Sequence, residues 1–422
     1  MIKFAWILLL FSKLCMAQPS CDESKLPIIF VHGFLASGDT WATQIQRFSS
    51  NGYCDERMFV FDWNSVGIKQ KPDSLLDMFI SKVLVRTGAA KINLVAHSAG
   101  GGLCYGYLND SVRSARVAHY IHVGSVKIKQ PAGYNGDVPT LNIYSADDMI
   151  VKGGADVPGA TNLKETGMDH LQVASSEESF AAMYRFFNDN REPAMVTIMT
   201  DKSPNRLIGG RAVILGENSP LVNDSILVYS FNPKTGRRTG REPFKRMVTD
   251  SSGYWPAFEV GKKSYLEFEV HPRQARVISY FIEPSPRNNA HLYLRCLPSS
   301  GMLGSMLRSM PEDDRQTVIV IFSANNAIVS GRDELSIDGI PLSSDTLTPA
   351  NKTIIASFLY DDGDGISSGK TKKSFGPGIF LNAVDVMIKA DNRSTTEIIY
   401  NGRSIRLPCR PSKEVIQVAV FN

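Results

Sequence analysis

A short apolar run that ends in a serine flanked by small residues constrains the fold of this chain more than any other feature. Residues 92–97 have the composition of a buried parallel strand, and Ser98 follows them directly. This order predicts a sharp strand-to-helix turn that presents the Ser98 hydroxyl at the end of a sheet. Such a turn needs small neighbours because the helix passes close to the strand, and Ala96, Ala99 and Gly100 meet that need. The alternative is an ordinary helix start with Ser98 as its N-cap.

A second strand candidate upstream strengthens the interpretation of Ser98 as a nucleophile. Residues 26–31 read as a buried parallel strand that runs directly into a loop beginning with His32 and Gly33. In that position we expect the backbone N–H groups of Phe34 and Ala99 to form an oxyanion hole for a tetrahedral intermediate.

An acid and a base follow Ser98 in the order that a catalytic triad requires. The strand candidate 139–146 ends in two aspartates, and Asp148 is the preferred acid because Asp147 sits one residue early and points elsewhere. Asp147 remains the alternative. His170 is the one histidine after this acid in the N-terminal half, and its loop leads into an amphipathic segment at 176–188. A capping role at that helix is the structural alternative for His170.

The other histidines of this half are expected to have structural roles. His97 should point away from Ser98 and pack or hydrogen-bond at the turn, and His119 and His122 lie on a buried strand candidate at 117–123.

Together these residues resemble the α/β-hydrolase fold and, within it, the small secreted bacterial lipases with an Ala-His-Ser-x-Gly turn. The resemblance covers roughly residues 21–190, and the acid segment 146–151 is similar to theirs. It implies a mostly parallel sheet, Ser98 as the nucleophile, His170 as the proton carrier and Asp148 as the residue that orients it. It also implies no cofactor and no metal, and the triad intervals leave no room for a helical lid.

The resemblance further implies an ester or lipid substrate. Its acyl chain would lie in an open cleft beside Phe34, Leu35 and Met149, with Trp41 and Trp63 as further candidates for the walls. The same triad is compatible with a polyester, a thioester or an amide. A hypothesis from another class is a binding or adhesion protein whose hydrolase part is degenerate.

The N-terminus predicts export. Residues 1–17 have a positive start at Lys3, an apolar core too short to span a bilayer and a small-x-small signal, so we expect a signal peptide that is cleaved after Ala17. The protein would then be secreted or periplasmic, without a transmembrane segment. Lys and Arg (46) exceed Asp and Glu (42) only slightly, which argues against a nucleic-acid partner.

The cysteines agree with an oxidising compartment, but their number after signal cleavage is odd, so one should stay unpaired. After cleavage the cysteines are Cys21, Cys54, Cys104, Cys296 and Cys409. We expect Cys104 to be a buried free thiol, Cys21 and Cys54 to bridge the hydrolase N-terminus, and Cys296 and Cys409 to close the last domain.

Beyond residues 190–193 the alternation of strand and helix patterns stops, and an all-β sandwich or barrel is predicted. We expect domains at 18–192, 193–286 and 287–422, or one continuous β-region at 193–422. This arrangement resembles archaeal lipases whose C-terminal β-domain handles lipid, which implies lipid or surface contact. Strand candidates lie at 195–199, 212–215, 225–231, 265–270 and 276–282.

Two charged groups in the C-terminal half invite a functional interpretation. The acidic run at 361–365 lacks the full calcium-loop pattern, so a plain turn is expected. A basic group has the composition to contact anionic headgroups or fatty-acid carboxylates, although a solvated hairpin tip is the favoured interpretation. The basic group comprises Lys234, Arg237, Arg238, Arg241, Lys245 and Arg246.

Overall fold

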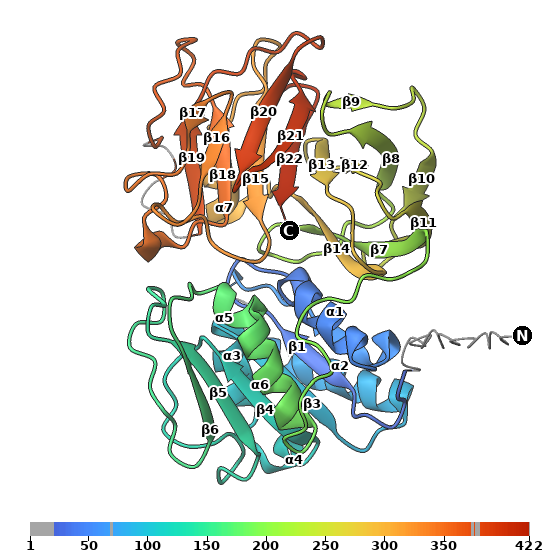
Figure 1. Cartoon of the computed structure of the whole chain (residues 1–422), viewed down its shortest axis with the longest axis vertical. Helices are drawn as coiled ribbons and strands as arrows, with labels where there is room; N and C mark the ends of the chain where they lie inside the picture. The colour runs from blue at the N-terminus through green and yellow to red at the C-terminus, as the bar shows by residue number, and fades with distance from the viewer. Residues whose placement is uncertain (1–20, 68–70, 373–374, 376–379, 422) are drawn as a thin grey trace, which may run out of the picture.

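The computed structural model describes residues 21–67, 71–372, 375 and 380–421. The chain forms two bodies, an α/β body from its N-terminal part and a β-rich body from its C-terminal part (Figure 1). The predicted signal peptide, residues 1–17, lies outside the described residues. Among the residues that are described, no helix is both long enough and apolar enough to cross a membrane.

The α/β body is built on a six-stranded sheet in which all neighbouring strands are parallel. The order β2-β1-β3-β4-β5-β6 places β1 between β2 and β3, so the direction of winding switches beside β1. Ligands of open parallel sheets bind outside the carboxyl ends of the strands at such a switch point. The strands are β1 (Ile28–Val31), β2 (Met58–Phe61), β3 (Ile92–His97), β4 (Val117–Val123), β5 (Thr140–Ser145) and β6 (Thr161–Glu165).

Helices cover both faces of this sheet. Alternate strand residues point to opposite faces, so Ile28 and Phe30 pack in one apolar cluster with α1 and α6, and Ile29 and Val31 pack in another with α2 and α3. This arrangement confirms the predicted α/β core. The helices are α1 (Ala42–Ser50), α2 (Pro72–Thr87), α3 (Ala99–Tyr107), α4 (Ser111–Ser114), α5 (Gln172–Ser175) and α6 (Glu177–Phe187), with 3-10 turns η1 (Gly38–Trp41) and η2 (Asp55–Arg57).

In its described residues, the β-rich body contains three sheets, which we call the large, interface and outer sheets. The large sheet has the order β10-β8-β12-β13-β22-β15-β18-β19, with β9 paired to β8; the interface sheet is β11-β7-β14, and the outer sheet is β17-β16-β20-β21.

The bounds of the large-sheet strands are β8 (Ser225–Asn232), β9 (Arg237–Arg238), β10 (Lys245–Val248), β12 (Leu266–His271), β13 (Ile278–Ile282), β15 (Val318–Ser323), β18 (Ala356–Tyr360), β19 (Leu381–Asp385) and β22 (Ile416–Phe421). The remaining elements are β7 (Asn205–Ile214), β11 (Tyr254–Gly261), β14 (Asn289–Cys296), α7 (Gly301–Leu307), β16 (Leu335–Ile337), β17 (Ile340–Pro341), η3 (Ala350–Lys352), β20 (Thr395–Tyr400) and β21 (Arg403–Pro408).

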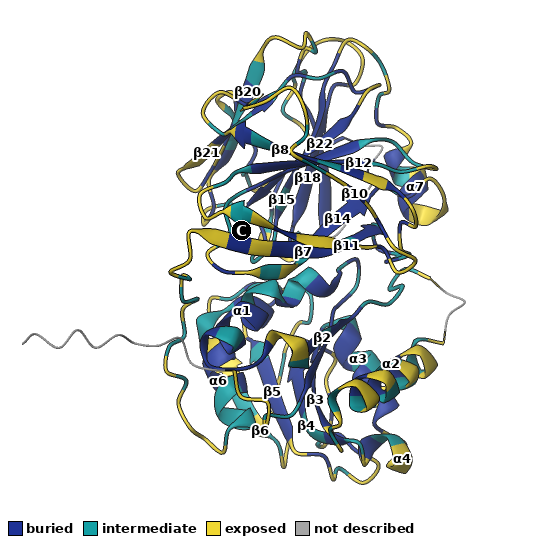
Figure 2. Cartoon of the chain, turned by 90° about the vertical axis from the view of Figure 1, so that its right-hand side faces the viewer, coloured by how far each residue is buried: buried dark blue, intermediate teal, exposed yellow. Residues whose placement is uncertain are grey.

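The large sheet is the middle layer of this body, and Figure 2 shows its central strands as buried. On β15, Val318 and Val320 face the interface sheet and α7, whereas Ile319 and Ile321 face the outer sheet. The interface sheet lies between the large sheet and the α/β body (Figure 1). The expected β-sandwich therefore has a third, smaller layer.

The large sheet also helps to decide between two β-domains with a boundary at residue 286 and one continuous β-region. It pairs β13, which precedes residue 286, with β22 near the C-terminus. We propose that residues 193–422 are one continuous β-region, because a boundary at 286 would divide a single hydrogen-bonded sheet.

Two sequence predictions for this half are wrong. Residues 195–199 form no strand. Instead, Met195 exchanges hydrogen bonds with the Asn51 side chain, and the Met199 N–H donates to Ser50 Oγ, so helix α1 satisfies their backbone groups.

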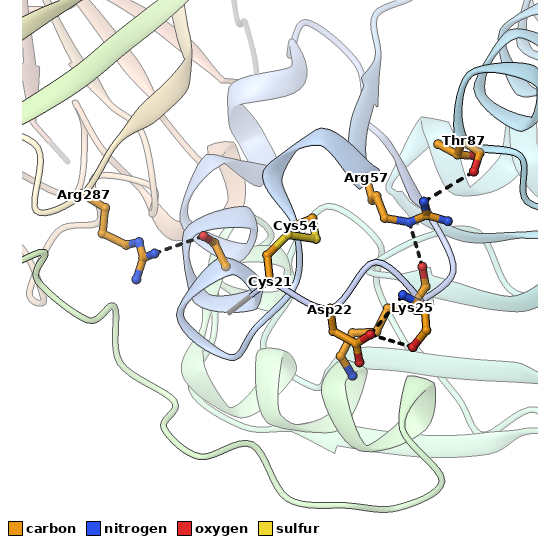
Figure 3. The surroundings of a disulfide bond; sticks show 9 residues. Cys21, Asp22, Lys25, Cys54, Arg57, Thr87 and Arg287 are labelled. Carbon is orange, nitrogen blue, oxygen red and sulfur yellow. Dashed lines mark hydrogen bonds between the residues drawn. A yellow bond between two sulfur atoms is a disulfide. The ribbon is translucent and has the colours of Figure 1, made fainter. Parts of the chain in front are cut away.

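The second wrong prediction is the Cys296–Cys409 disulfide, since both thiols are free and buried. The large sheet separates them: Cys296 packs between the interface and large sheets, and Cys409 packs between the large and outer sheets. The other cysteine expectations are confirmed, because Cys104 is free and buried and Cys21 is bonded to Cys54 (Figure 3).

Candidate active site

Ser98 occupies the sharp turn between β3 and α3. Its φ of 54° lies in the left-handed region, which non-glycine residues adopt only where the surrounding structure holds them. The neighbours must be small: a Cβ on Gly100 would lie 2.4 Å from the carbonyl oxygen of His32, and one on Gly101 would lie 2.3 Å from Ser125 Oγ. The close approach of α3 to the sheet thus explains the run of small residues.

The structure brings Ser98, His170 and Asp148 into one hydrogen-bonded chain. His170 Nε2 lies 2.8 Å from Ser98 Oγ, and His170 Nδ1 lies 2.7 Å from Asp148 Oδ2. The other oxygen of Asp148 accepts hydrogen bonds from the backbone N–H groups of Ile150 (2.8 Å) and Val151 (3.0 Å). The three side chains therefore have the connectivity of a nucleophile, a base and an orienting acid.

Electrostatics favour an ionised Asp148. Burial would raise the pKa of this carboxyl, but the hydrogen bond and charge of His170, together with the two backbone N–H groups, outweigh it and hold the pKa below its usual value. Asp147, the alternative acid, instead accepts a hydrogen bond from the Gly167 N–H at 2.6 Å and does not reach His170.

The loop after β1 lies against the nucleophile. A Cβ on Gly33 would lie 2.8 Å from Ser98 Cβ, so this position needs glycine. Within the described part of the chain, the N–H groups of Phe34 and Ala99 have no hydrogen-bond partner. An oxyanion hole requires such unpaired donors, so the two N–H groups meet this requirement of the prediction.

His97 lies beneath the triad and has a structural environment. Its Nε2 is 2.8 Å from the carbonyl oxygen of His170, to which it donates, and its ring lies 4.6 Å from the His170 ring. Burial, followed by the charge of His170, lowers the pKa of His97 to about 3, so it is neutral at physiological pH. His119 forms a hydrogen bond with the Asn93 side chain, away from Ser98. His122 forms hydrogen bonds with the Tyr120 hydroxyl and the Val126 carbonyl oxygen, also away from Ser98.

An apolar cavity leads from Ser98 and His170 into the β-rich body. Phe34 and Leu35 line it, as expected, but Met149 does not and is 39% exposed. Trp41 and Trp63 are not in the lining either, because they pack in the α/β cores. Most of the lining comes from the β-rich body: Leu215, Ile278, Tyr280, Arg295, Leu297, Val320, Phe322, Ala324, Ile355, Ala356, Phe358, Phe380, Leu381 and Val418.

Sequence reasoning missed this wall of the cavity. Val320 lies between the equally apolar Ile319 and Ile321, because both faces of the large sheet are buried. An alternation between apolar and polar residues, which would have marked one face, is absent from this part of β15.

The β-rich body also contacts the loop that carries His170. Phe380 stacks on the His170 ring at 6.0 Å. Asp169, directly before His170, accepts hydrogen bonds from Arg332 Nη1 (2.8 Å) and from the backbone N–H of Ala327 (3.0 Å). The position of the base thus depends on side chains far away in the sequence.

Some members of the two charged groups of the C-terminal half form ion pairs with neighbouring side chains. In the basic group, Arg238 is held by Glu267 and Glu269, and Arg246 by Glu242. In the acidic turn, the Lys372 ammonium lies beside Asp362 and 3.7 Å from Asp385 Oδ1. One lysine therefore pairs with two carboxylates at this turn.

Comparisons with known proteins agree with this architecture. Residues 25–107 match the family Lipase (class 2), and residues 206–299 match the Lipase C-terminal domain. A lipase from Bacillus licheniformis is 18% identical with a TM-score of 0.32, and the match covers 40% of this chain and 94% of that one. Naproxen esterase (carboxylesterase NP) from Bacillus subtilis is 14% identical with a TM-score of 0.31, covering 40% of this chain and 86% of that one.

Lipase B from Aspergillus fumigatus is a further similar structure, with 15% identity, a TM-score of 0.32 and coverage of 42% of this chain and 56% of that one. Lipases hydrolyse carboxylic esters, and this is the reaction class that the family matches support. The chain thus combines an α/β-hydrolase-like part that matches the class 2 lipase family with a following part that matches the lipase C-terminal domain.

Proposed function

We propose that this protein is a secreted lipase or esterase that acts through Ser98, His170 and Asp148 and a covalent acyl-enzyme. The observation that carries the proposal is the pair of hydrogen bonds that joins Ser98 Oγ to His170 (2.8 Å) and His170 to Asp148 (2.7 Å). The free N–H groups of Phe34 and Ala99 beside this serine support it.

In the proposed reaction, Ser98 Oγ attacks the ester carbonyl while His170 Nε2 accepts the hydroxyl proton. The carbonyl oxygen becomes an oxyanion, to which the Phe34 and Ala99 N–H groups donate hydrogen bonds. The bond to the alkoxy group then breaks, and His170 returns the proton to the leaving alcohol. Water attacks the acyl-enzyme in the same way and releases the carboxylic acid and Ser98.

The acyl group is proposed to enter the apolar cavity beside Ser98. Its lining is mostly Leu, Ile, Val and Phe side chains, and the carboxylate and guanidinium groups in it, Asp39 and Arg295, pair with each other, which suits a hydrocarbon chain. The contribution of the β-rich body to this lining supports a role in substrate binding for the C-terminal half.

Secretion is part of the proposal. It rests on the signal-peptide pattern of residues 1–17 and agrees with the Cys21–Cys54 disulfide, since such bonds persist mainly in oxidising compartments. Export of the full chain, with an N-terminus at Gln18 in the exported protein by mass spectrometry, is the expected result.

The test is hydrolysis of p-nitrophenyl esters from acetate to palmitate. Ser98→Ala should abolish turnover, and the exposed Ser111→Ala should not. Asp148→Asn should lower kcat by roughly 10⁴-fold, because His170 loses its orienting charge. Asp147→Asn is the matched control and should retain activity, since Asp147 lies away from His170.

The alternatives predict other outcomes of the same experiment. A folded protein that cleaves thioesters or amides, but no ester, would move the assignment to another substrate of the same triad. A folded protein that cleaves none of them and is not labelled by a fluorophosphonate would favour the binding-protein hypothesis.

A further inference from the structure

The turn after β7 reaches out of the β-rich body and contacts the loop that carries the proposed oxyanion donor. Asn218 in this turn is 5% exposed, and its φ of 55° places it in the left-handed region that asparagine tolerates. The contacted loop, residues 33–37, belongs to the α/β body and follows β1.

The Asn218 side chain bonds the loop at several points. Its Oδ1 accepts a hydrogen bond from Ser37 Oγ at 2.5 Å, and its Nδ2 donates to the carbonyl oxygen of Ala36 at 2.9 Å. The same Nδ2 donates to the carbonyl oxygen of Trp63 at 3.0 Å, which ties the loop to the segment after β2. A single amide thus uses both of its ends to fix this loop.

The loop needs such support because its backbone is strained. Leu35 has a φ of 59°, a conformation that costs a non-glycine residue about 1–3 kcal/mol and persists only where neighbours enforce it. The Leu35 side chain is 5% exposed and packs in the apolar cluster of the β-rich body. Its N–H donates to Ser65 Oγ at 2.9 Å, and the Ser65 hydroxyl reaches the Gly216 carbonyl oxygen at 3.3 Å.

The position of this loop bears directly on the reaction. Phe34, the proposed oxyanion donor, lies between Gly33, which contacts Ser98, and the strained Leu35. A change in the Leu35 backbone would rotate the Phe34–Leu35 segment and move the Phe34 N–H relative to Ser98 Oγ. The side chains that hold Leu35 and Ala36 therefore set the geometry of the oxyanion hole.

We propose that Asn218 is a positioning residue for the oxyanion hole, and that the β-rich body acts in catalysis through the turn Gly216–Asn218 as well as in substrate binding. This inference rests on the proposed function, because it assigns a role in ester hydrolysis. It predicts that loss of the Asn218 side chain weakens transition-state stabilisation while ground-state binding is retained.

The experiment compares Asn218→Gly with Asn223→Gly. Glycine accepts the left-handed backbone at both positions, so only the side chain is removed. Asn223 is a matched control because it has a φ of 57° and belongs to the same body, but it is exposed and remote from the loop. On p-nitrophenyl butyrate, Asn218→Gly should lower kcat by roughly 10- to 100-fold with KM within about twofold, and Asn223→Gly should match the parent.

A second readout separates positioning from general damage. A butylboronic acid forms a tetrahedral adduct with Ser98 that places an oxygen in the oxyanion hole, whereas butanol competes only for the acyl site. Asn218→Gly should weaken inhibition by the boronic acid by about the same factor as kcat/KM and leave inhibition by butanol unchanged. A folded variant with parental kcat, or with equal losses for both inhibitors, would overturn the proposal.

Ser65→Ala covers the case in which Asn218→Gly does not fold. It removes the acceptor of the Leu35 N–H through the loss of one partly exposed hydroxyl, and it should lower kcat about 5- to 10-fold with an unchanged KM. A parental kcat in this variant would also overturn the proposal. If the parent protein itself cleaves no ester, the proposed function fails, and that result is distinct from an active parent with unaffected variants.

Discussion

Gly33→Ala is a sharp test of the proposed oxyanion geometry. An added Cβ would lie 2.8 Å from Ser98 Cβ and 3.3 Å from Ser98 Oγ. Nonbonded carbon atoms normally lie about 3.5–4.0 Å apart, so the loop and the nucleophile must separate by roughly 0.7–1.2 Å. Gly33 does not have a positive φ, so alanine fits its backbone and the strain is confined to this contact.

The expected loss follows from that displacement. Removal of one oxyanion donor lowers kcat by about 10²–10³, and a misplacement of about 1 Å costs about 10². We therefore expect kcat of Gly33→Ala to fall roughly 100-fold, which corresponds to about 2.7 kcal/mol of transition-state stabilisation. KM for a short ester should change little, because the acyl cavity is lined mainly by residues of the β-rich body.

The assay is the steady-state hydrolysis of p-nitrophenyl butyrate, with thermal unfolding measured in parallel. Gly106→Ala is the matched control: it also replaces a glycine of the α/β body, near the end of α3, but a Cβ there meets nothing within 4 Å. It should retain activity and gain about 0.4–1 kcal/mol of stability. A kcat of Gly33→Ala within threefold of the parent, in a folded protein, would refute the assignment of this loop as the oxyanion loop.

Three further predictions concern the supports of the site and the fold. Arg332→Met removes the ion pair with Asp169 and should lower kcat about tenfold and the free energy of unfolding by roughly 1.5–3 kcal/mol. Parental values for both quantities would show that the ion pair contributes neither to catalysis nor to stability. His97 stays neutral in the folded protein down to about pH 3 but takes up a proton below 6.5 when unfolded. His97 alone should therefore lower stability in urea by about 1.4 kcal/mol per pH unit below 6.5, and His97→Gln should reduce the overall slope by one proton, whereas an unchanged slope would contradict the shift. The double variant Cys21→Ser/Cys54→Ser opens a loop with a sequence separation of 33 and should lose roughly 2–4 kcal/mol of stability with kcat unchanged, so a large drop in kcat would point to an unexpected link with the site.

The α/β body was predictable because its signals are local. The strand before Ser98 is apolar throughout, and the small residues after it are demanded by backbone contacts that the structure shows at Gly100. The choice of Asp148 over Asp147 followed from the spacing at the end of one strand, and the two carboxyl groups indeed have different partners. A pattern confined to one strand and its turn can be interpreted without knowledge of the rest of the fold.

The β-rich body was less predictable because its constraints are non-local. Both faces of the large sheet are buried, and a strand such as β15 is apolar on both, so its sequence does not identify the face toward Ser98. Cys296 and Cys409 were expected to pair because they were the two remaining cysteines of the C-terminal half, but the large sheet separates them. Residues 195–199 have the composition of a strand, but side chains of α1 take their backbone hydrogen bonds.

The contact between the two bodies explains why a hydrolase of this kind would retain a large β-region. Asp62 beside β2 is buried and receives hydrogen bonds from Arg211 and Tyr293 of the interface sheet, and Asp39 pairs with the buried Arg295. Separation of the bodies would break these ion pairs and expose Leu35 and the apolar lining of the cavity to water. The same interface holds the strained Leu35 and closes the acyl cavity. The two bodies are therefore expected to unfold as one cooperative unit. The ion pairs between them form, and the strained Leu35 backbone is held, only when both bodies are folded and in contact.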